Sequence, residues 1–221
     1  MSSARFPVLL VLLLSACQMI PGGQEPQRKA VSRSAQPLVV RPETRACLAD
    51  LGSKRAAFTP LPDQYYGAGC STLGTVQLAS LHSDNATLAL AGLGPVTCPL
   101  ADTFAGWARF GVDRAARQIL GSELVKIETM GSYNCRNVAG SARRSAHATA
   151  SAIDVSGFVL ADGRRITVSG NWADNAPKVR RFFQAIHTSA CKRFGTVLGP
   201  AYNAAHRDHL HLEINGSGTC K

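Results

Sequence analysis

The alternation of apolar and polar residues along the chain predicts a set of short β-strands. The clearest case is residues 75–93, where two apolar runs flank the turn-forming sequence HSDN and predict a hairpin. A second hairpin is expected where the sequence ADG separates an apolar run from RRITVS. The strand-forming segments are 75–93, 123–130, 151–160, 164–169 and 209–214.

A different spacing, with apolar residues three and four positions apart, predicts a helix over residues 175–195. Asn175 is a candidate N-cap, Pro177 suits the first turn, and Gly195 is a candidate terminator. His187 falls outside the apolar stripe and is expected at the surface or at a rim. The stripe itself consists of Val179, Phe182, Phe183, Ile186, Ala190 and Phe194.

Residues 101–120 also have helical character, with Asp102 or Thr103 as the candidate cap and Gly111 as a point that could divide the helix in two. No internal repeat is visible. Strands and helices are interleaved irregularly, and this order favours an α+β fold with a central antiparallel sheet and flanking helices.

The N-terminal residues do not fit this pattern. Residues 8–14 form an apolar run too short to cross a bilayer and typical of a signal peptide. The run ends in LSAC, which resembles a bacterial lipobox and predicts a signal peptide at 1–16 with lipidation at Cys17. Cleavage of an ordinary signal peptide nearby, with Cys17 incidental, is the alternative. Residues 17–45, rich in Pro, Gly, Gln and Arg, predict a flexible tether, and 46–221 the folded domain.

Such a leader predicts an exported lipoprotein, anchored to a membrane and facing the periplasm or cell envelope. The formal net charge of +10 suits an anionic polymer or a lipid surface, or simply a soluble basic surface. We expect no nucleic-acid partner, because no basic run carries interleaved aromatic residues and an exported protein is in the wrong compartment.

The cysteine count supports export. Six of the seven cysteines remain once Cys17 is set aside, and an even number in an exported chain predicts three disulfides. Fifteen pairings are possible, and the simplest guess joins nearest neighbours as 47–70, 98–135 and 191–220. The candidates are Cys47, Cys70, Cys98, Cys135, Cys191 and Cys220.

Histidines are concentrated in HRDHLHLE, residues 206–213, which holds three of the six in the chain. On a strand, His209 and His211 project from one face, while Leu210 and Leu212 point the other way toward the core. Two imidazoles on one face suit metal binding, or one ligand with one acid–base group. An exposed strand with incidental histidines is the alternative.

A second cluster lies upstream. His147 would end a loop, and Asp154 lies seven residues later in an apolar strand, where a carboxylate is costly to bury unless it is paired or bound to a metal. Catalytic zinc sites use three protein ligands and leave one position for water. His147, Asp154 and either His209 or His211 would supply that set.

The pattern S-x-H-x-x-A-x-A-x-D from Ser145 to Asp154, followed by a late H-x-H, resembles the LAS-type zinc metallopeptidases. That group includes D-alanyl-D-alanine carboxypeptidases, a murein endopeptidase and the hedgehog amino-terminal domain. Within it, the segment from Cys47 to Cys220 is similar to the bacterial extensin-like C-terminal domain family. The matching stretches include TCPLAD, GSYNCR, SAHATASAIDVSGF and CKRFGTVLGPAYNAAHRDHLHLE.

This resemblance implies a hedgehog-like or D-Ala-D-Ala-peptidase-like site that binds Zn²⁺ through His147, Asp154 and His211. It implies that His209 and His206 assist catalysis. Arg136 would stabilise the oxyanion or hold the substrate carbonyl, and an incidental surface arginine is the alternative.

The sequence departs from that pattern at two points. Ala150 replaces the usual glycine, which matters if the position requires a positive φ. No glutamate stands where the carboxypeptidase branch has its general base. Glu213 shares the strand face of His211 and could support the site or simply be exposed.

Three hypotheses follow. The first is a cell-envelope zinc peptidase acting on peptidoglycan stem peptides or cross-links. The second is a non-catalytic, zinc-stabilised lipoprotein that binds peptidoglycan. The third is a disulfide-rich lipoprotein whose histidines bind nothing.

Overall fold

The computed structural model describes residues 42–221. The expected signal peptide, the lipidation site Cys17 and most of the expected tether lie outside these residues. Helix α1 (Pro42–Ser53) includes the last four residues of the expected tether and crosses the expected domain boundary at residue 46. Within residues 42–221, no helix is long and apolar enough to cross a membrane.

A ten-stranded sheet forms the centre of the domain, and most of its strand pairs are antiparallel. Only β5–β7 and β10–β12 pair in parallel among the strands of residues 42–221. The path through the sheet is β1-β4-β5-β7-β8-β11-β10-β12, with β6 paired to β4 and β9 to β8. The strands are β1 (Ala57–Pro60), β4 (Thr75–His82), β5 (Thr87–Ala91), β6 (Val96–Thr97), β7 (Leu124–Gly131), β8 (Ala152–Leu160), β9 (Arg165–Thr167), β10 (Thr196–Leu198), β11 (Leu210–Glu213) and β12 (Thr219–Cys220).

Both hairpins expected from the sequence are present, as β4–β5 and β8–β9. The expected strands 123–130 and 209–214 correspond to β7 and β11. Short strands without a clear alternating pattern were not predicted, and in the ten-stranded sheet these are β1, β6, β10 and β12.

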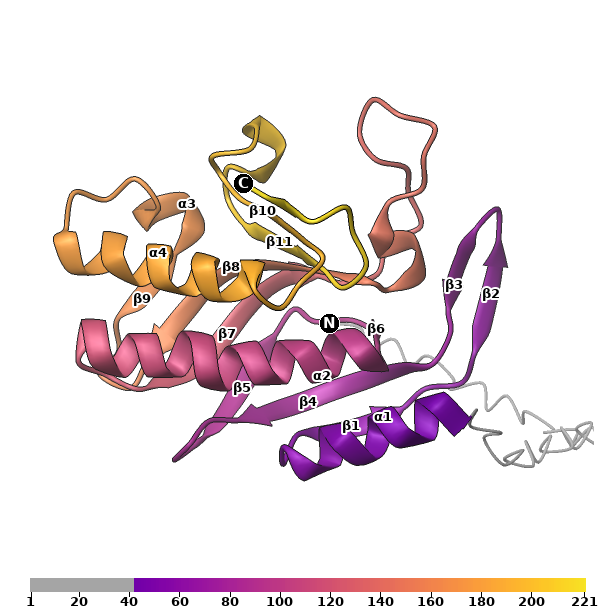
Figure 1. Cartoon of the computed structure of the whole chain (residues 1–221), viewed down its shortest axis with the longest axis horizontal. Helices are drawn as coiled ribbons and strands as arrows, with labels where there is room; N and C mark the ends of the chain where they lie inside the picture. The colour runs from indigo at the N-terminus through magenta and orange to yellow at the C-terminus, as the bar shows by residue number, and fades with distance from the viewer. Residues whose placement is uncertain (1–41) are drawn as a thin grey trace, which may run out of the picture. The chain divides into compact units, whose positions relative to one another are not determined.

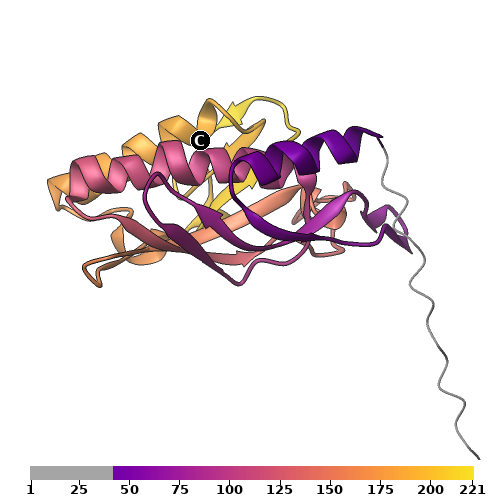
Figure 2. The same cartoon turned by 90° about the horizontal axis from the view of Figure 1, so that it is seen from below.

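Helices α1, α2 (Cys98–Trp107) and α4 (Pro177–Cys191) cover one face of the sheet (Figures 1 and 2). A shorter helix, α3 (Val168–Asn171), follows β9. The apolar stripe of α4 faces inward as expected: Phe182, Phe183 and Ile186 are buried. The α+β architecture with a largely antiparallel sheet is therefore confirmed.

The predicted helix ends were less accurate. Ala176, not Asn175, is the N-cap of α4, and the helix ends at Cys191, well before Gly195. Thr97, not Asp102 or Thr103, caps α2.

Gly111 does not divide the helix that begins at α2. The helix continues as two wide π-helical turns, η1 (Ala108–Asp113) and η2 (Ala116–Leu120). A Cβ at Gly111 would lie 2.5 Å from the hydroxyl oxygen of Ser189 on α4. Glycine is therefore needed here for close packing of two helices, and this reason is invisible in the local sequence.

Three disulfides form, as the cysteine count predicted, but only one guessed pairing is correct. Cys191 bonds Cys220 as expected. Cys47 bonds Cys98 because α1 packs against the start of α2, and Cys70 bonds Cys135 because a separate hairpin folds toward the loop after β7. The guesses 47–70 and 98–135 were wrong because they used distance along the chain, whereas contacts between elements decide the pairing.

Candidate metal site and its cleft

Two neighbouring strands place a histidine and an aspartate side by side. In the antiparallel pair β8–β11, His211 is directly opposite Asp154, and the His211 Nδ1 atom lies 2.9 Å from Asp154 Oδ1. Leu210 and Leu212 are fully buried on the other side of β11. The predicted alternation of this strand is confirmed, and the buried leucines hold the His211 ring in place.

His147 reaches the same point from a short 3₁₀ helix, η3 (Ala146–Thr149). The Ser145 hydroxyl caps this helix by accepting a hydrogen bond from the His147 backbone amide. The His147 Nε2 atom lies 3.1 Å from Asp154 Oδ2 and 3.3 Å from His211 Nδ1. Ala150 ends η3 with φ 54° and ψ 29°, so the position does require the left-handed conformation that glycine adopts most easily.

His147, Asp154 and His211 fit a metal ion by two tests. Each offers one ligand atom, and the three atoms lie within 4.8 Å of one another, as ligands of a common ion must. Two imidazole nitrogens and one carboxylate oxygen are also the donor types that zinc accepts in catalytic sites.

Outer contacts orient both rings for this role. His147 Nδ1 lies 3.0 Å from the Ser132 carbonyl oxygen, so a proton on Nδ1 leaves Nε2 free toward Asp154. His211 Nε2 lies 3.5 Å from a carboxylate oxygen of Glu213, which leaves Nδ1 toward Asp154. Hydrogen bonds of this kind fix the tautomer of metal-binding histidines. Glu213 is therefore a supporting residue and not an incidental one.

In the metal-free protein the three groups form a charged network. Burial alone would raise the pKa of Asp154, but hydrogen bonds from His147 and His211 outweigh burial and hold this pKa well below its usual range. Burial alone would lower the pKa of His211, but its bonds to Asp154 and Glu213 raise the pKa to about 9. In the absence of a metal ion, Asp154 and His211 therefore stabilise each other's charged forms.

His209 and His206 stand beside this group. His209 Nε2 lies 3.5 Å from Asp154 Oδ1, and its Nδ1 lies 2.9 Å from a carboxylate oxygen of Asp208. The His206 ring lies 5.2 Å from the His209 ring and 5.8 Å from the His211 ring, between centroids. Partial burial and the neighbouring imidazoles lower the pKa of His206 to about 4.

These histidines form part of the wall of a cleft of about 520 Å³. Arg136 and Arg143, from the loop after β7, line the cleft together with His206, His209 and His211. Arg136 is exposed, and the one hydrogen bond its guanidinium makes within residues 42–221 is to the carbonyl oxygen of Asn137. The structure thus brings together all six residues predicted for the site.

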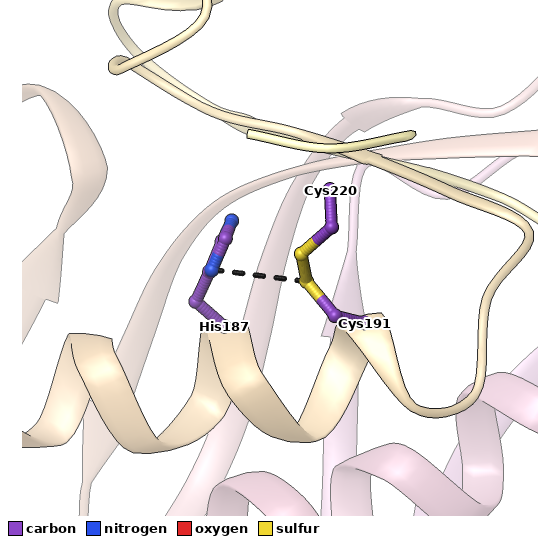
Figure 3. A group of neighbouring side chains, drawn as sticks. All are labelled: His187, Cys191 and Cys220. Carbon is purple, nitrogen blue, oxygen red and sulfur yellow. Dashed lines mark hydrogen bonds between the residues drawn. A yellow bond between two sulfur atoms is a disulfide. The ribbon is translucent and has the colours of Figure 1, made fainter. Parts of the chain in front are cut away.

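Figure 3 shows the second group of residues that could hold a metal ion by their spacing, formed by His187, Cys191 and Cys220. His187 Nδ1 lies 3.8 Å from Cys191 Sγ, but both sulfur atoms belong to one disulfide and are not available as thiolate ligands. His187 is partly exposed and packs against Trp172, as expected for a rim residue. The first group is therefore the candidate metal site.

Some contributors to the site could not be predicted from the sequence. Ser132 acts through its backbone carbonyl, which has no residue-type signature. The side-chain oxygen of Asn203 accepts a hydrogen bond from His206 Nδ1 at 2.7 Å, and the Tyr202 ring packs edge-on against His206. The contact between Asp208 and His209 could have been predicted, because the two residues are adjacent in the sequence.

Comparison with known proteins identifies the family. Residues 45–221 match the model of the extensin-like protein C-terminus, so the chain belongs to this family. Neither the curated proteins nor the solved structures include a match to the chain.

Proposed function

We propose that this protein is a zinc-dependent peptidase of the cell envelope that hydrolyses peptide bonds of peptidoglycan. The observation that carries the proposal is the convergence of His147, Asp154 and His211. His211 also lines a cleft that presents His209 and Arg136. The substrate class rests on the resemblance of the motifs to LAS-type peptidases and on the expected export of the chain.

His147 Nε2, an Asp154 oxygen and His211 Nδ1 would hold the zinc ion. A zinc ion with three protein ligands lowers the pKa of a coordinated water to about 7 and polarises a substrate carbonyl. The contacts of Ser132 and Glu213 with the two histidines support such a role, because they orient the ligand atoms before any ion binds.

His209 is suited to move the proton between the attacking water and the leaving amine. Its Nδ1 contacts Asp208, so its Nε2 faces the ligand group. Arg136 faces the cleft, where it can stabilise negative charge that develops on the carbonyl oxygen. The His206 ring packs against the rings of His209 and His211, and so helps to position His209.

A lipid anchor at Cys17 would hold the domain on a membrane in the periplasm or cell envelope, within reach of peptidoglycan. The reach would be set by the tether of residues 17–45.

One observation favours a second candidate function, a non-catalytic zinc-stabilised module that binds peptidoglycan. Among residues 42–221, the carboxylate that lines the cleft is Glu213, and it contacts His211. The cleft therefore offers no free carboxylate as a general base, and turnover depends on His209.

The test is zinc stoichiometry of the full-length protein together with mass analysis of peptidoglycan digested by it. We expect one zinc per chain and new peptide fragments. His147→Ala should lose zinc and activity together. His209→Ala should keep zinc and lose about 10²- to 10⁴-fold in rate, as expected for a general acid–base group.

His82→Ala is the matched control, because His82 lies on β4 and bonds only the backbone of Ser83 among residues 42–221. It should keep both zinc and activity. Stoichiometric zinc without any new fragment would eliminate the peptidase and leave the binding module. Failure to bind zinc even after reconstitution would eliminate both.

A further inference from the structure

The four tyrosines of the chain are distributed differently from its other aromatic residues. The largest fully buried side chains include Trp107, Phe104, Phe158 and Phe182, but no tyrosine. Tyr65, Tyr66 and Tyr202 are 78%, 55% and 47% exposed, and Tyr133 is half-buried. Exposed tyrosines are typical of binding surfaces, because the ring is apolar and its hydroxyl tip is polar.

One tyrosine lies at the cleft, one lies on the loop that carries Arg136, and two lie on a hairpin linked to that loop. Tyr202 lines the cleft itself. Tyr65 and Tyr66 lie on strand β2 (Gln64–Gly67), which forms a separate two-stranded hairpin with β3 (Cys70–Thr72). We call this hairpin the tyrosine arm. Figure 1 shows it beside the loop that follows β7.

The arm is tied to the loop that lines the cleft. The disulfide Cys70–Cys135 joins β3 to the residue that precedes Arg136. On the same loop, Arg144 Nε donates to the Ala68 carbonyl oxygen at the tip of the arm, at 2.6 Å. A two-stranded hairpin is marginally stable by itself, so these two links hold it in place. The chain thus fixes an exposed arm to the loop that carries Arg136 and Arg143.

These two links also bring together two tyrosine rings, one from the arm and one from the loop after β7. The Tyr66 and Tyr133 ring centroids lie 5.4 Å apart with an interplanar angle of 40°. Tyr66 belongs to the arm, whereas Tyr133 lies three residues before Arg136. The pair is therefore a small aromatic platform beside the loop whose Arg136 lines the cleft.

We propose that the Tyr66–Tyr133 platform binds the glycan strand of peptidoglycan, a polymer of N-acetylated amino sugars, and so presents the attached stem peptide to the cleft. This proposal rests on the proposed function for the identity of the polymer. A sugar ring has C–H groups on its face and hydroxyl groups at its edge, which match the apolar face and polar tip of a tyrosine.

The dimensions of the arm favour a narrow polymer over a protein partner. A stable protein interface needs about 800 Å² from each side, centred on a well-packed apolar patch. The arm consists of strands of four and three residues, and its remaining exposed residues are Gln64, Gly67, Ala68 and Gly69. It offers aromatic rings without large aliphatic side chains around them.

The test measures binding without catalysis. Full-length protein stripped of metal with EDTA is titrated with the tetrasaccharide of N-acetylglucosamine by calorimetry, and is cosedimented with isolated peptidoglycan. We expect Tyr66→Ala and Tyr133→Ala each to weaken binding of both probes by about 5- to 10-fold, the scale of one aromatic contact. Tyr66→Phe keeps the ring and should retain most of the affinity.

Phe110→Ala is the matched control, because Phe110 is 41% exposed but lies in η1 on the helical face. It should bind like the wild type. Thermal melting confirms that each variant is folded. The proposal is overturned if wild-type protein does not bind the tetrasaccharide, or if Tyr66→Ala/Tyr133→Ala binds both probes normally.

A glycan-free stem peptide separates this proposal from the proposed function. If the protein is a peptidase, the tyrosine variants should cleave this peptide at the wild-type rate while losing activity on intact peptidoglycan. If neither the wild-type protein nor any variant cleaves it, the proposed peptidase function is rejected. The tetrasaccharide titration still decides whether the platform binds glycan.

Discussion

The helical face and the cleft end of this domain are built from opposite kinds of residue. Under the helices, fully buried aromatic rings pack edge to face, as in the pairs Trp107–Phe194 at 6.1 Å and Phe158–Phe182 at 5.5 Å between centroids. At the cleft end, the buried groups are His147, His211 and the carboxylate of Asp154, and they contact chiefly one another.

The two regions respond differently to their environment. Apolar packing does not depend on protonation or on ions, so the helical face should keep its stability over a wide range of conditions. Buried polar groups are costly unless they are all paired. The stability contributed by the cleft end should therefore depend on pH when no metal is bound. The main role of these residues is to bind, and their contribution to stability is secondary.

The strongest test of this contrast is Trp107→Ala. Trp107 is fully buried, and its indole N–H donates to the Ile186 carbonyl oxygen at 3.0 Å. Loss of the ring leaves a cavity and removes this hydrogen bond, so we expect a loss of about 3–5 kcal/mol in the free energy of unfolding. Urea denaturation measures it, with Phe110→Ala as an exposed control expected to change it by less than about 0.5 kcal/mol. A loss below about 1 kcal/mol for Trp107→Ala would contradict the contrast.

The second test is the pH dependence of the metal-free protein. The pKa of His211 is raised to about 9 in the folded state from an ordinary value of 6.5. The stabilisation from its proton is complete below pH 6.5 and is lost as the pH rises through 9, by about 3 kcal/mol in total. The pKa of Asp154 is lowered, so its contribution disappears instead when the pH falls below its ordinary value of 3.8.

Asp154→Asn removes the main partner of the His211 proton and should flatten the slope between pH 6.5 and 9. Urea unfolding in EDTA at several pH values measures this slope. Asp162→Asn is the control, because Asp162 pairs with Arg164 at the surface, away from the histidines. A slope that persists in Asp154→Asn would mean that another group stores the proton.

The same contrast explains what the sequence could predict. Periodicity identified the buried stripe of α4 and the alternation of Leu210 and Leu212 with histidines, because these patterns are local. Motif spacing and family resemblance predicted six site residues, and the structure brings them together. The Cys47–Cys98 and Cys70–Cys135 bonds were not predictable, because they depend on contacts between elements far apart in the chain.

Gly111 is a further case in which a distant contact overrides a local pattern, and it provides the third test. A methyl group at this position would lie 2.5 Å from Ser189 Oγ and 2.9 Å from Trp107 Cδ1. We expect Gly111→Ala to lose about 1–2 kcal/mol of stability, because overpacking outweighs the gain in helix propensity. Combining it with Ser189→Ala should recover part of the loss in urea denaturation. A Gly111→Ala variant more stable than the wild type would show that the helices can move apart at little cost.

The smallest expected effect concerns Ala150, which links the two regions. It ends η3 beside His147, and its carbonyl oxygen accepts a hydrogen bond from the Thr97 amide at the start of α2. The left-handed conformation costs an alanine about 1 kcal/mol relative to glycine, whereas glycine would lose a fully buried methyl group.

We expect Ala150→Gly to raise the free energy of unfolding by about 0.5 kcal/mol or less, and Ala150→Val to lower it by more than about 2 kcal/mol, because a β-branched side chain tolerates a positive φ poorly. Zinc affinity should follow the same order, since the turn positions His147. A destabilised Ala150→Gly would mean that packing of the methyl group, and not backbone strain, explains why this chain carries alanine where the related motif has glycine.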